Sequence, residues 1–412
     1  MTERQQVIIR NASVLDAAAG ELVPDRVIVV EGEEIVDVGG PDVRAADAMA
    51  VDAGGRVVMP GLIDAHVHVL AYTADLPGAS EQSPSYVAAR ASAIMRGMLE
   101  RGFTTVRDAA GADYGLARAV REGYFVGPRV LFGGKALSQT GGHGDPRSPG
   151  RDVHEDAYCA PSHCRIVDGV DEVRKAARDE LRRGADHLKL MLGGGVASPT
   201  DRIDSTQFSV EEIRAAVEEA TAANRYVLGH AYTARAVNRG LEAGVRSIEH
   251  GNLMDDTSIK LFAEHDAFYV PTLATYSALA EEGLAAGLPP ASHRKVFEVL
   301  DAGLGALELA HRGGVKMVYG TDLLGDMHYR QLTEFSIRAR VQPPADIIRA
   351  ATTTAAELLG LTGRAGTVAP GAFADLLVVD GNPLDDIAVL TRPDEALRLI
   401  MHAGRIHRNS LG

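Results

Sequence analysis

Two histidines placed two residues apart, His66 and His68, close a short apolar segment with the sequence GLIDAHVHV. Side chains alternate between the two faces of a β-strand, so residues two apart point to the same side. The two imidazoles can therefore converge on one point, while Ala65 and Val67 face the other way. Converging imidazoles are a good start for a transition-metal site. Two surface histidines near a turn are the alternative that this segment alone leaves open.

A lysine lies inside a second apolar segment, DHLKLML at residues 186–192. Leu188, Leu190 and Leu192 alternate with it and can pack on surrounding helices, which points Lys189 to the inside. A buried ammonium is costly, so either its pKa falls or it finds a partner. A neutral lysine amine near divalent metal can react with CO2 to give a carbamate whose two oxygens bridge two ions. A salt bridge to an interior acid is the alternative.

Three further strand-like segments each end in a group that can bind metal. VLGHAYT carries His230, SIEHGN carries His250, and VYGTD ends in Asp322. Any one of these can be a structural residue with its hydrogen bonds satisfied, which is the common fate of a single histidine. The joint observation is harder to attribute to chance, because every such segment carries its metal-competent group at the same end. The pattern predicts one shared metal site.

The elements that would position these groups alternate between strand and helix along the middle of the chain. The candidate strands are Leu62–His68, Phe103–Asp108, Arg129–Gly133, Asp186–Leu192, Tyr226–Ala231, Val245–His250, Ala267–Leu273 and Lys316–Asp322. Strands alternating with helices indicate a parallel sheet. Eight units over roughly 250 residues match the closed (β/α)8 TIM barrel, in which active groups sit at the carboxyl ends of the strands. We therefore predict an α/β fold with a barrel domain over residues 61–364.

Helix signals support this alternation. SVEEIRAAVEEATAAN (209–224) and DEVRKAARDELRRG (171–184) are helical patterns. Ser209 followed three residues later by Glu212 is typical of a capping box. Gly184 suits a helix carboxyl-terminal cap.

Both ends of the chain are instead rich in strand patterns. Val29–Val38 reads as a hairpin around a Glu-Gly-Glu-Glu turn, and the segments at 373–381 and 397–408 are again strands around turns. The amino-terminal segment alone is too short to bury a good core. We therefore predict a small β-sandwich domain formed by residues 1–60 together with 365–412.

Composition excludes several classes of function. The 412 residues are 46% hydrophobic and 24% charged, with a net charge of -14 and no Trp. An acidic protein with few aromatic residues is poorly suited to nucleic acid or to an anionic membrane surface. No apolar signal-peptide core and no long apolar run occur, which predicts a cytoplasmic protein. The two cysteines, Cys159 and Cys164, make a disulfide framework improbable.

A long loop rich in Gly, Pro, His and Asp follows the third candidate strand and spans 138–168. Loops of this length in a compact barrel are usually functional or mobile. His143, in GGHGD, is a candidate to bind the carbonyl oxygen or a carboxylate of a substrate, or else to stabilise the loop. The group His154, Cys159, His163 and Cys164 fits no zinc-knuckle spacing, which favours a structural loop.

Other residues near the predicted strand ends have weaker signals. Tyr232 shares the inward direction of His230 and can contact substrate or simply pack. His328, on the last loop, is a further candidate substrate contact. An inward Arg107–Asp108 pair at the end of the second strand is interpreted as structural. The GGG at 193–195 lacks the GK[ST] of a phosphate loop, which excludes nucleotide binding.

HVH, the strand lysine, the two separate histidines and the terminal Asp together resemble the amidohydrolase superfamily in its binuclear-metal branch. The split β domain is similar too, so the resemblance spans nearly the whole chain. It implies that His66, His68 and Asp322 hold one ion, that His230 and His250 hold the other, and that a carboxylated Lys189 bridges them. We expect zinc in such a histidine-rich site. A metal-bridging hydroxide would attack, with Asp322 shuttling its proton to the departing amine.

The phrases GGHGD, KLMLGGGVASP and HAYT further resemble a bacterial subgroup related to imidazolonepropionase. That subgroup includes Xaa-Pro and Xaa-Arg/Lys dipeptidases and N-acyl amino acid hydrolases, which implies amide or peptide hydrolysis and a homo-oligomer. A basic leaving residue would require an acidic partner, for which Glu81, Asp145 and Asp326 are candidates. A lactonase or organophosphate-type esterase on the same metals, and a non-catalytic scaffold of the same fold, are the alternatives.

Overall fold

The computed structural model describes residues 6–79, 81–147, 150, 163–198 and 200–411. The chain divides into two compact units. A terminal unit is drawn from Met1–Asp64, Gly97–Thr105 and Phe335–Gly412, and a central unit from Ala65–Arg96 and Val106–Glu334. In this division residues 61–64, 97–105 and 335–364, which the sequence prediction assigned to the barrel domain, group with the terminal unit.

Backbone hydrogen bonds inside the terminal unit explain its larger extent. Leu62 donates its N–H to Gly102 O at 3.0 Å, and Ile63 donates to Ala351 O at 2.8 Å. These bonds join segments that lie far apart in the sequence, and sequence periodicity carries no information about such long-range partners.

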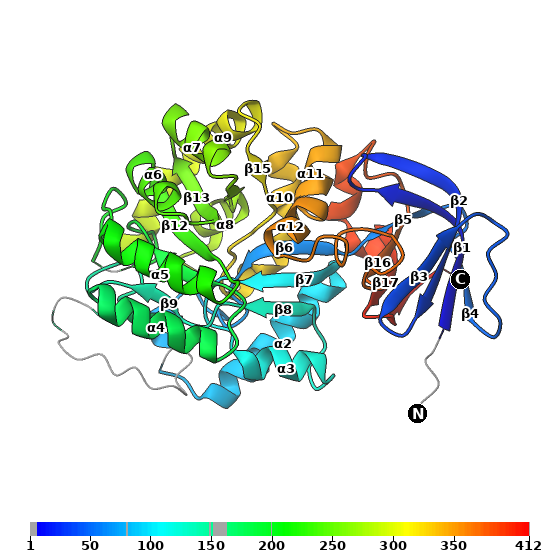
Figure 1. The fold of residues 1–412 in the computed structure, drawn as a ribbon, viewed down its shortest axis with the longest axis horizontal. Helices are drawn as coiled ribbons and strands as arrows, with labels where there is room; N and C mark the ends of the chain where they lie inside the picture. Colours follow the sequence, from blue (N-terminus) through cyan, green and yellow to red (C-terminus); the bar gives the residue numbers. More distant parts are fainter. Residues whose placement is uncertain (1–5, 80, 148–149, 151–162, 199, 412) are drawn as a thin grey trace. The chain divides into compact units, whose positions relative to one another are not determined.

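The terminal unit contains one extended sheet in the order β18-β17-β16-β5-β1-β2-β3, with β4 paired to β1 (Figure 1). Its strands are β1 (Gln6–Asp16), β2 (Glu21–Glu31), β3 (Glu34–Gly39), β4 (Met49–Asp52), β5 (Val57–Pro60), β16 (Leu376–Val379), β17 (Leu397–His402) and β18 (Arg405–Asn409). The predicted hairpin is confirmed by the pairing of Glu31 with Glu34. Antiparallel pairing of Val58 with Val378 joins the two ends of the chain in one β-sandwich.

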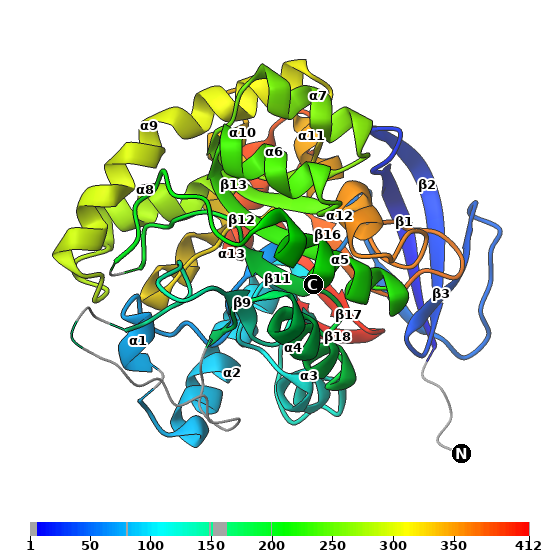
Figure 2. The same ribbon diagram turned by 60° about the vertical axis from the view of Figure 1, so that its left-hand side comes forward.

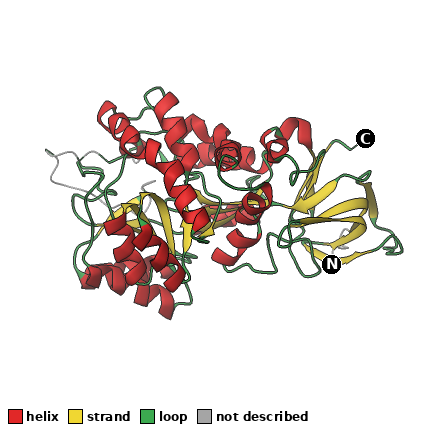
Figure 3. Cartoon of the chain, turned by 90° about the horizontal axis from the view of Figure 1, so that it is seen from above, coloured by secondary structure: helices red, strands yellow, loops and turns green. Residues whose placement is uncertain are grey.

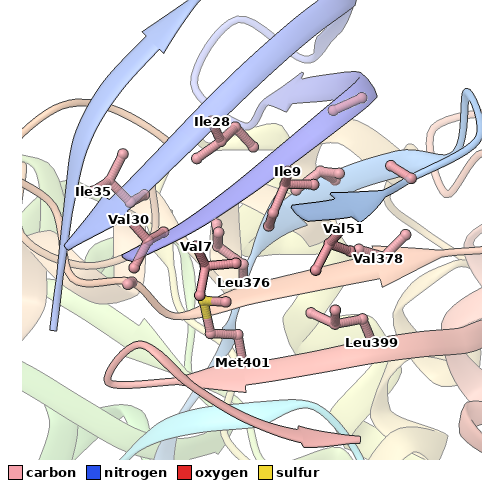
Figure 4. Packing of buried hydrophobic residues seen from close by; sticks show 14 of the residues in the cluster. Val7, Ile9, Ile28, Val30, Ile35, Val51, Leu376, Val378, Leu399 and Met401 are labelled. Atoms are coloured by element: carbon pink, nitrogen blue, oxygen red, sulfur yellow. The ribbon is translucent and has the colours of Figure 1, made fainter. Parts of the chain in front are cut away.

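The core of the terminal unit is apolar where these strands meet, formed by aliphatic side chains and Met401 (Figure 4). Leu376 and Val378 lie two residues apart on β16 and therefore face the same side. They pack in one buried cluster with Leu399 of β17 and with Val7 and Ile9 of β1. Burial of these side chains supplies the hydrophobic stabilisation that neither end of the chain has alone.

The central unit and the strands that lead into it form the predicted (β/α)8 barrel. Its barrel strands are β6 (Leu62–Val67), β7 (Phe103–Asp108), β8 (Arg129–Phe132), β11 (Leu188–Met191), β12 (Val227–Thr233), β13 (Ser247–Leu253), β14 (Phe268–Val270) and β15 (Lys316–Met317). Each lies within or overlaps one predicted strand. Asp186 N–H donates to Phe132 O and Ala65 N–H donates to Tyr319 O, both at 2.8 Å, which links the sheet β6-β7-β8 to the sheet β10-β9-β11-β12-β13-β14-β15.

Helices surround the strands of the central unit (Figures 2 and 3). The helices of the chain are α1 (Leu76–Ala79), α2 (Pro84–Glu100), α3 (Tyr114–Arg121), α4 (Val170–Arg182), α5 (Val210–Ala222), α6 (Ala234–Glu242), α7 (Asp256–Glu264), α8 (Leu273–Glu282), α9 (Pro290–Arg312), α10 (Thr333–Arg338), α11 (Pro344–Ala350), α12 (Thr353–Leu358), α13 (Pro393–Ala396) and the 3-10 turns η1 (Gly325–Leu332) and η2 (Ile387–Thr391). Two short strands, β9 (Ala136–Ser138) and β10 (Cys164–Ile166), extend the larger sheet.

Helix ends behave as predicted at two positions. The capping box of α5 is present, with Ser209 and Glu212 each bonding the backbone of the other. Gly184 follows α4 with a φ of 98°, a conformation that favours glycine. Among the helices of the described residues, none is long and apolar enough to span a bilayer.

Candidate metal centre

The first three predicted ligands converge at the carboxyl ends of the barrel strands. His66 Nε2 lies 3.5 Å and His68 Nε2 lies 3.2 Å from Asp322 Oδ1. One ligand atom from each of the three residues lies within 4.8 Å of the other two. His66 and His68 are two residues apart on one strand, so their convergence follows from the alternation of side chains.

The remaining predicted ligands lie against this group. The His250 ring is 5.1 Å from His66 and 4.5 Å from His230, measured between ring centroids. His250 Nδ1 is 4.0 Å from Asp322 Oδ2. Lys189 lines the same cavity as these residues. The structure therefore brings together every residue that the sequence predicted as a metal ligand.

Each of the four histidines has one ring nitrogen bonded to a protein group that can accept a hydrogen bond. The contacts are His66 Nδ1 to Glu249 Oε2 at 2.6 Å, His68 Nδ1 to Ala110 O at 2.8 Å, His230 Nε2 to Gly194 O at 3.1 Å and His250 Nδ1 to Thr272 Oγ1 at 2.7 Å. A nitrogen that donates in this way carries the ring proton, so the other nitrogen keeps its lone pair. That arrangement is the usual second shell of a histidine bound to metal. The donor set fits divalent metal.

Lys189 is an isolated cation in this cavity. Its side chain is buried, with 2% of the residue exposed, and no hydrogen bond or ion pair joins it to another residue in the described part of the chain. Burial lowers the pKa of Lys189 to about 8, although Glu249 and Asp322 oppose the shift. Its amine is therefore far more readily available in neutral form than that of an ordinary lysine.

The protonation of most of the other groups also suits metal binding. The exception is His68, because burial by itself would lower its pKa, but the hydrogen bond and charge of Asp322 outweigh burial and raise the pKa of His68. Burial, reinforced by Lys189 and neighbouring histidines, lowers the pKa of His66, His230 and His250 well below the usual value. Burial by itself would raise the pKa of Asp322, but the nearby His66 and His68 outweigh it and hold that pKa below its usual value. Neutral imidazoles and an ionised carboxylate are the forms that ligate zinc.

Glu249 is a buried residue at this site that the sequence prediction missed. It is fully buried, and it contacts His66 through one oxygen while both of its oxygens lie 2.9 Å from Arg107 Nη2. Ser247, two residues earlier on β13, donates to Glu249 Oε1 at 2.6 Å. The fully paired carboxylate fixes the orientation of His66.

Arg107 and Asp108 do not act as an inward pair, because each contacts a different part of the site. Adjacent residues of a strand point to opposite sides, so Arg107 reaches Glu249 in the barrel interior whereas Asp108 does not. Asp108 instead accepts the backbone N–H of Val69 at 2.7 Å and of Ala112 at 3.0 Å. Both residues have a structural role, as predicted, but they stabilise different parts of the site.

A left-handed backbone conformation explains why the alternation of side chains along β13 did not predict Glu249 at the site. His250 has a φ of 78° and Asp322 a φ of 52°, and Thr272, the partner of His250, has a φ of 49°. Such values are rare for residues other than glycine and cost free energy. The turn at His250 brings its side chain into the barrel beside that of Glu249, although strict alternation would separate them. Strain of this kind is concentrated at functional sites.

A cavity of about 120 Å³ lies over these groups. His143 and Tyr232 line it, as expected for substrate contacts, and the His143 ring stacks on His230 at 4.2 Å. Tyr276, a lining residue that the prediction missed, donates its hydroxyl to Tyr232 Oη at 3.2 Å. The apolar wall is formed by Leu76, Pro77, Val196, Leu279 and Leu324.

Several other predicted residues lie elsewhere. His328 is 6% exposed, does not line the cavity, and has its Nε2 3.1 Å from Ala71 O. Glu81 and Asp326 are outside the lining as well. Asp145 does line the cavity, but it is ion-paired with Arg147 at 2.6 Å.

The loop group formed by His154, Cys159, His163 and Cys164 lies partly outside the described residues. His154 and Cys159 fall outside the described residues. His163 and Cys164 both line the cavity, and the His163 ring lies 5.8 Å from that of His68. No cluster with zinc-like ligand geometry includes them within the residues that the structure covers.

Known proteins with a similar sequence or structure agree with this description of the site. The model of the amidohydrolase family matches residues 57–406. Ochratoxinase from Aspergillus niger is 32% identical over 99% of this chain and 88% of its own length. A solved prolidase complexed with N-methylphosphonate-L-proline is 48% identical, with a TM-score of 0.96 over 98% of this chain and all of the other. A Xaa-Pro dipeptidase with bound methionine is 29% identical, with a TM-score of 0.86 over 98% and 100% of the two chains. The chain belongs to the amidohydrolase family.

Proposed function

We propose that this protein hydrolyses the amide bond of a dipeptide or N-acyl amino acid with the help of two divalent metal ions. The observation that carries the proposal is the set of four histidines, each with one nitrogen fixed by an acceptor, arranged around the isolated amine of Lys189 and the Asp322 carboxylate. In each ring the other nitrogen then keeps the lone pair that an ion needs.

The residues fit a binuclear centre in which His66, His68 and Asp322 hold one ion and His230 and His250 hold the other. Lys189, carboxylated by CO2, would bridge them, and zinc is the ion that this donor set favours. Ions bound there supply an activated water and polarise the scissile carbonyl.

The chain's own groups move the proton and orient the ligands. Asp322 accepts the proton of the attacking water and transfers it to the leaving amine. Its carboxylate is ionised at neutral pH because His66 and His68 hold its pKa down. Glu249 and Arg107 keep the His66 ring in place, so the ligand does not reorient between turnovers.

The cavity favours an uncharged leaving residue such as proline. Among the described residues of the lining, the carboxylates are Asp322 and Asp145, and Asp145 is already paired with Arg147. Among these described residues an arginine or lysine side chain of a substrate would find no available partner, whereas Leu76, Leu279 and Leu324 offer apolar contact. The prolidase among the relatives carries a proline phosphonate, which supports the same substrate class. His143 and Tyr232 are proposed to hydrogen-bond the substrate.

A substrate screen tests the proposal. The zinc-loaded protein would be assayed against Xaa-Pro, Xaa-Arg and N-acyl amino acids beside lactones and paraoxon, with metal content measured in parallel. We expect Xaa-Pro or N-acyl amino acid hydrolysis, at rates well above Xaa-Arg. Faster turnover of lactones or paraoxon would favour an esterase. A protein that retains no divalent ion and gains no activity with zinc and bicarbonate would be a non-catalytic scaffold.

A further inference from the structure

Lys295 lies on α9, is not a lining residue of the cavity, and is nevertheless bonded to the loop that forms one of its walls. Its Nζ donates to three backbone carbonyls: Gly195 O at 3.1 Å, Ser198 O at 3.0 Å and Asp201 O at 2.7 Å. An ammonium has three N–H donors, so this contact set saturates it. The side chain is 18% exposed, and Asp201 Oδ1 lies 3.6 Å from the charge.

The loop that Lys295 binds continues into a chain of polar contacts that ends in the cavity. Ser198 Oγ contacts both Asp201 Oδ1 and His143 Nδ1, the latter at 3.0 Å. A hydroxyl has one proton, and the Asp201 carboxylate is a stronger acceptor than the Gly195 carbonyl, which is also within reach. Ser198 therefore donates to Asp201 and accepts from the Nδ1–H of His143. The Nε2 of His143 is left as the nitrogen available to a ligand.

The same loop is packed directly against the His143 ring. A Cβ on Gly195 would stand 1.9 Å from two atoms of that ring, and a Cβ on Gly194 would stand 1.7 Å from Arg202 O. The loop backbone can therefore approach His143 only because residue 195 is glycine, and Gly194 allows the loop to pack on the backbone of Arg202. The His143 ring also stacks on His230. The ring is therefore held by the loop and by His230, and its tautomer depends on where the loop places Ser198.

We propose that Lys295 is a positioning residue of the active site, which holds the loop at Gly195, Ser198 and Asp201 and thereby fixes the tautomer with which His143 meets the substrate. This inference rests on the proposed function, in which His143 contacts the substrate. It assigns a role to a surface helix residue that touches neither the substrate nor the metal ligands. The ammonium is suited to it because its three donors match three carbonyls, whereas the flat guanidinium of arginine would not.

The first test requires no substrate. Ring nitrogen shifts of the zinc-loaded protein labelled with ¹⁵N-histidine report the tautomer of each histidine, and His143→Gln identifies the signals of His143. We expect the Nδ1–H tautomer in the wild type and a mixture of tautomers in Lys295→Met. Arg294→Met, an exposed cation next to it on α9, is the matched control and should leave the spectrum unchanged. An unchanged His143 signal in Lys295→Met, or an Nε2–H tautomer in the wild type, would overturn the inference.

Ser198→Ala is the second variant, in case Lys295→Met fails to fold. It leaves the contacts of Lys295 to the backbone carbonyls in place and removes the acceptor of His143. We expect the same mixture of tautomers, and a retained Nδ1–H tautomer contradicts the proposed chain of contacts. Loss of bound zinc from Lys295→Met would mean that Lys295 acts on His230, whose Nε2 contacts the carbonyl of Gly194 in the same loop. That result would also overturn the assignment to His143.

A double-mutant cycle then tests the link to catalysis. Lys295→Met should lower kcat/KM about 10-fold in the wild-type background, but less than about twofold when His143 is already Gln, because coupled residues are not additive. Equal losses in both backgrounds would mean that Lys295 acts by another route while amide hydrolysis itself stands. If no amide substrate is turned over, the proposed function fails, and the tautomer measurement still decides the role of Lys295.

Discussion

The apolar core of the terminal unit and the candidate metal site of the central unit both contain almost fully buried side chains, but of opposite chemistry. Leu376, Val378 and Leu399 are fully buried in the first region, and Lys189 and Glu249 are almost fully buried in the second. Burial of an aliphatic side chain stabilises the fold by roughly 1.5–3 kcal/mol. Burial of a titratable group costs free energy and perturbs its pKa. The comparison separates residues that stabilise the protein from residues whose burial is used for chemistry.

The Lys189 amine gives the clearest measure of that cost. Its pKa falls from 10.5 to about 8. At 1.36 kcal/mol per unit this difference corresponds to roughly 3 kcal/mol for holding the charged form. The cost equals the gain from burying one or two core leucines. A chain retains such a group where the neutral amine has a function, which here is the proposed carboxylation.

The largest expected effect is on the chemical step. We predict that Asp322→Asn lowers kcat by about 10³–10⁴-fold, because an amide cannot carry the proton from water to the leaving amine. Asparagine tolerates the left-handed φ of 52° at this position, so the fold should persist. Bound zinc, measured by mass spectrometry, should be largely retained. The control is Asp326→Asn, since Asp326 is exposed and lies on the following turn. Near-normal turnover in Asp322→Asn would show that Asp322 is not the proton carrier.

This comparison also shows what the sequence alone could predict. The barrel strands and their terminal ligands follow from local patterns, because alternation within a strand and the parallel arrangement of barrel strands bring such groups to one end. His66, Lys189 and His250 were found in this way. The capping box of α5 was equally local.

Residues that act through distant contacts could not be found from local patterns. Glu249 was hidden by the left-handed turn at His250, which breaks alternation. Lys295 bonds a loop about 100 residues earlier in the chain, and nothing in its own helix marks it. His328 was predicted as a substrate contact from its position after Asp322, but the chain directs it towards Ala71 instead.

A core substitution should lower the free energy of unfolding and leave kcat unchanged, which is the opposite of the effect expected for Asp322→Asn. We predict that Leu376→Ala lowers the free energy of unfolding by roughly 3–4 kcal/mol, because it leaves a cavity in the aliphatic cluster. The kcat of the folded fraction should be unchanged. Denaturant unfolding with a parallel assay measures both. Val36→Ala on β3, where the side chain is 44% exposed, is the matched control and should cost much less. A large loss of kcat in Leu376→Ala at full folding would break the comparison.

Removing the Lys189 amine should stabilise the metal-free protein. The folded pKa is below the unfolded value, so the unfolded state binds more protons between pH 8 and 10.5, and the full cost of Lys189 is present below pH 8. We predict that metal-free Lys189→Met exceeds metal-free wild type in unfolding free energy by roughly 3 kcal/mol at pH 7. The gap should shrink as pH rises towards 10.5. Chelator-treated protein unfolded in denaturant at several pH values measures it, and a pH-independent gap would contradict burial as the cause.

The smallest expected effect concerns polar groups that stabilise without taking part in chemistry. Ser209 Oγ accepts the N–H of Glu212 at 3.2 Å, and Glu212 in turn accepts the N–H of Ser209 and of Gly169, both at 2.6 Å. We predict that Ser209→Ala costs about 1 kcal/mol of unfolding free energy, which is typical for the loss of a helix N-cap. Ser209→Asp should restore it, since Asp also caps, and kcat/KM should stay constant in both variants. Because this site is exposed, its hydrogen bonds replace bonds to water and not an unsatisfied state, so their removal costs little. If Ser209→Ala lowered the free energy of unfolding as much as Leu376→Ala, an exposed polar group would stabilise the fold as strongly as a core side chain. The comparison between buried apolar and polar residues would then not separate stabilising from catalytic residues.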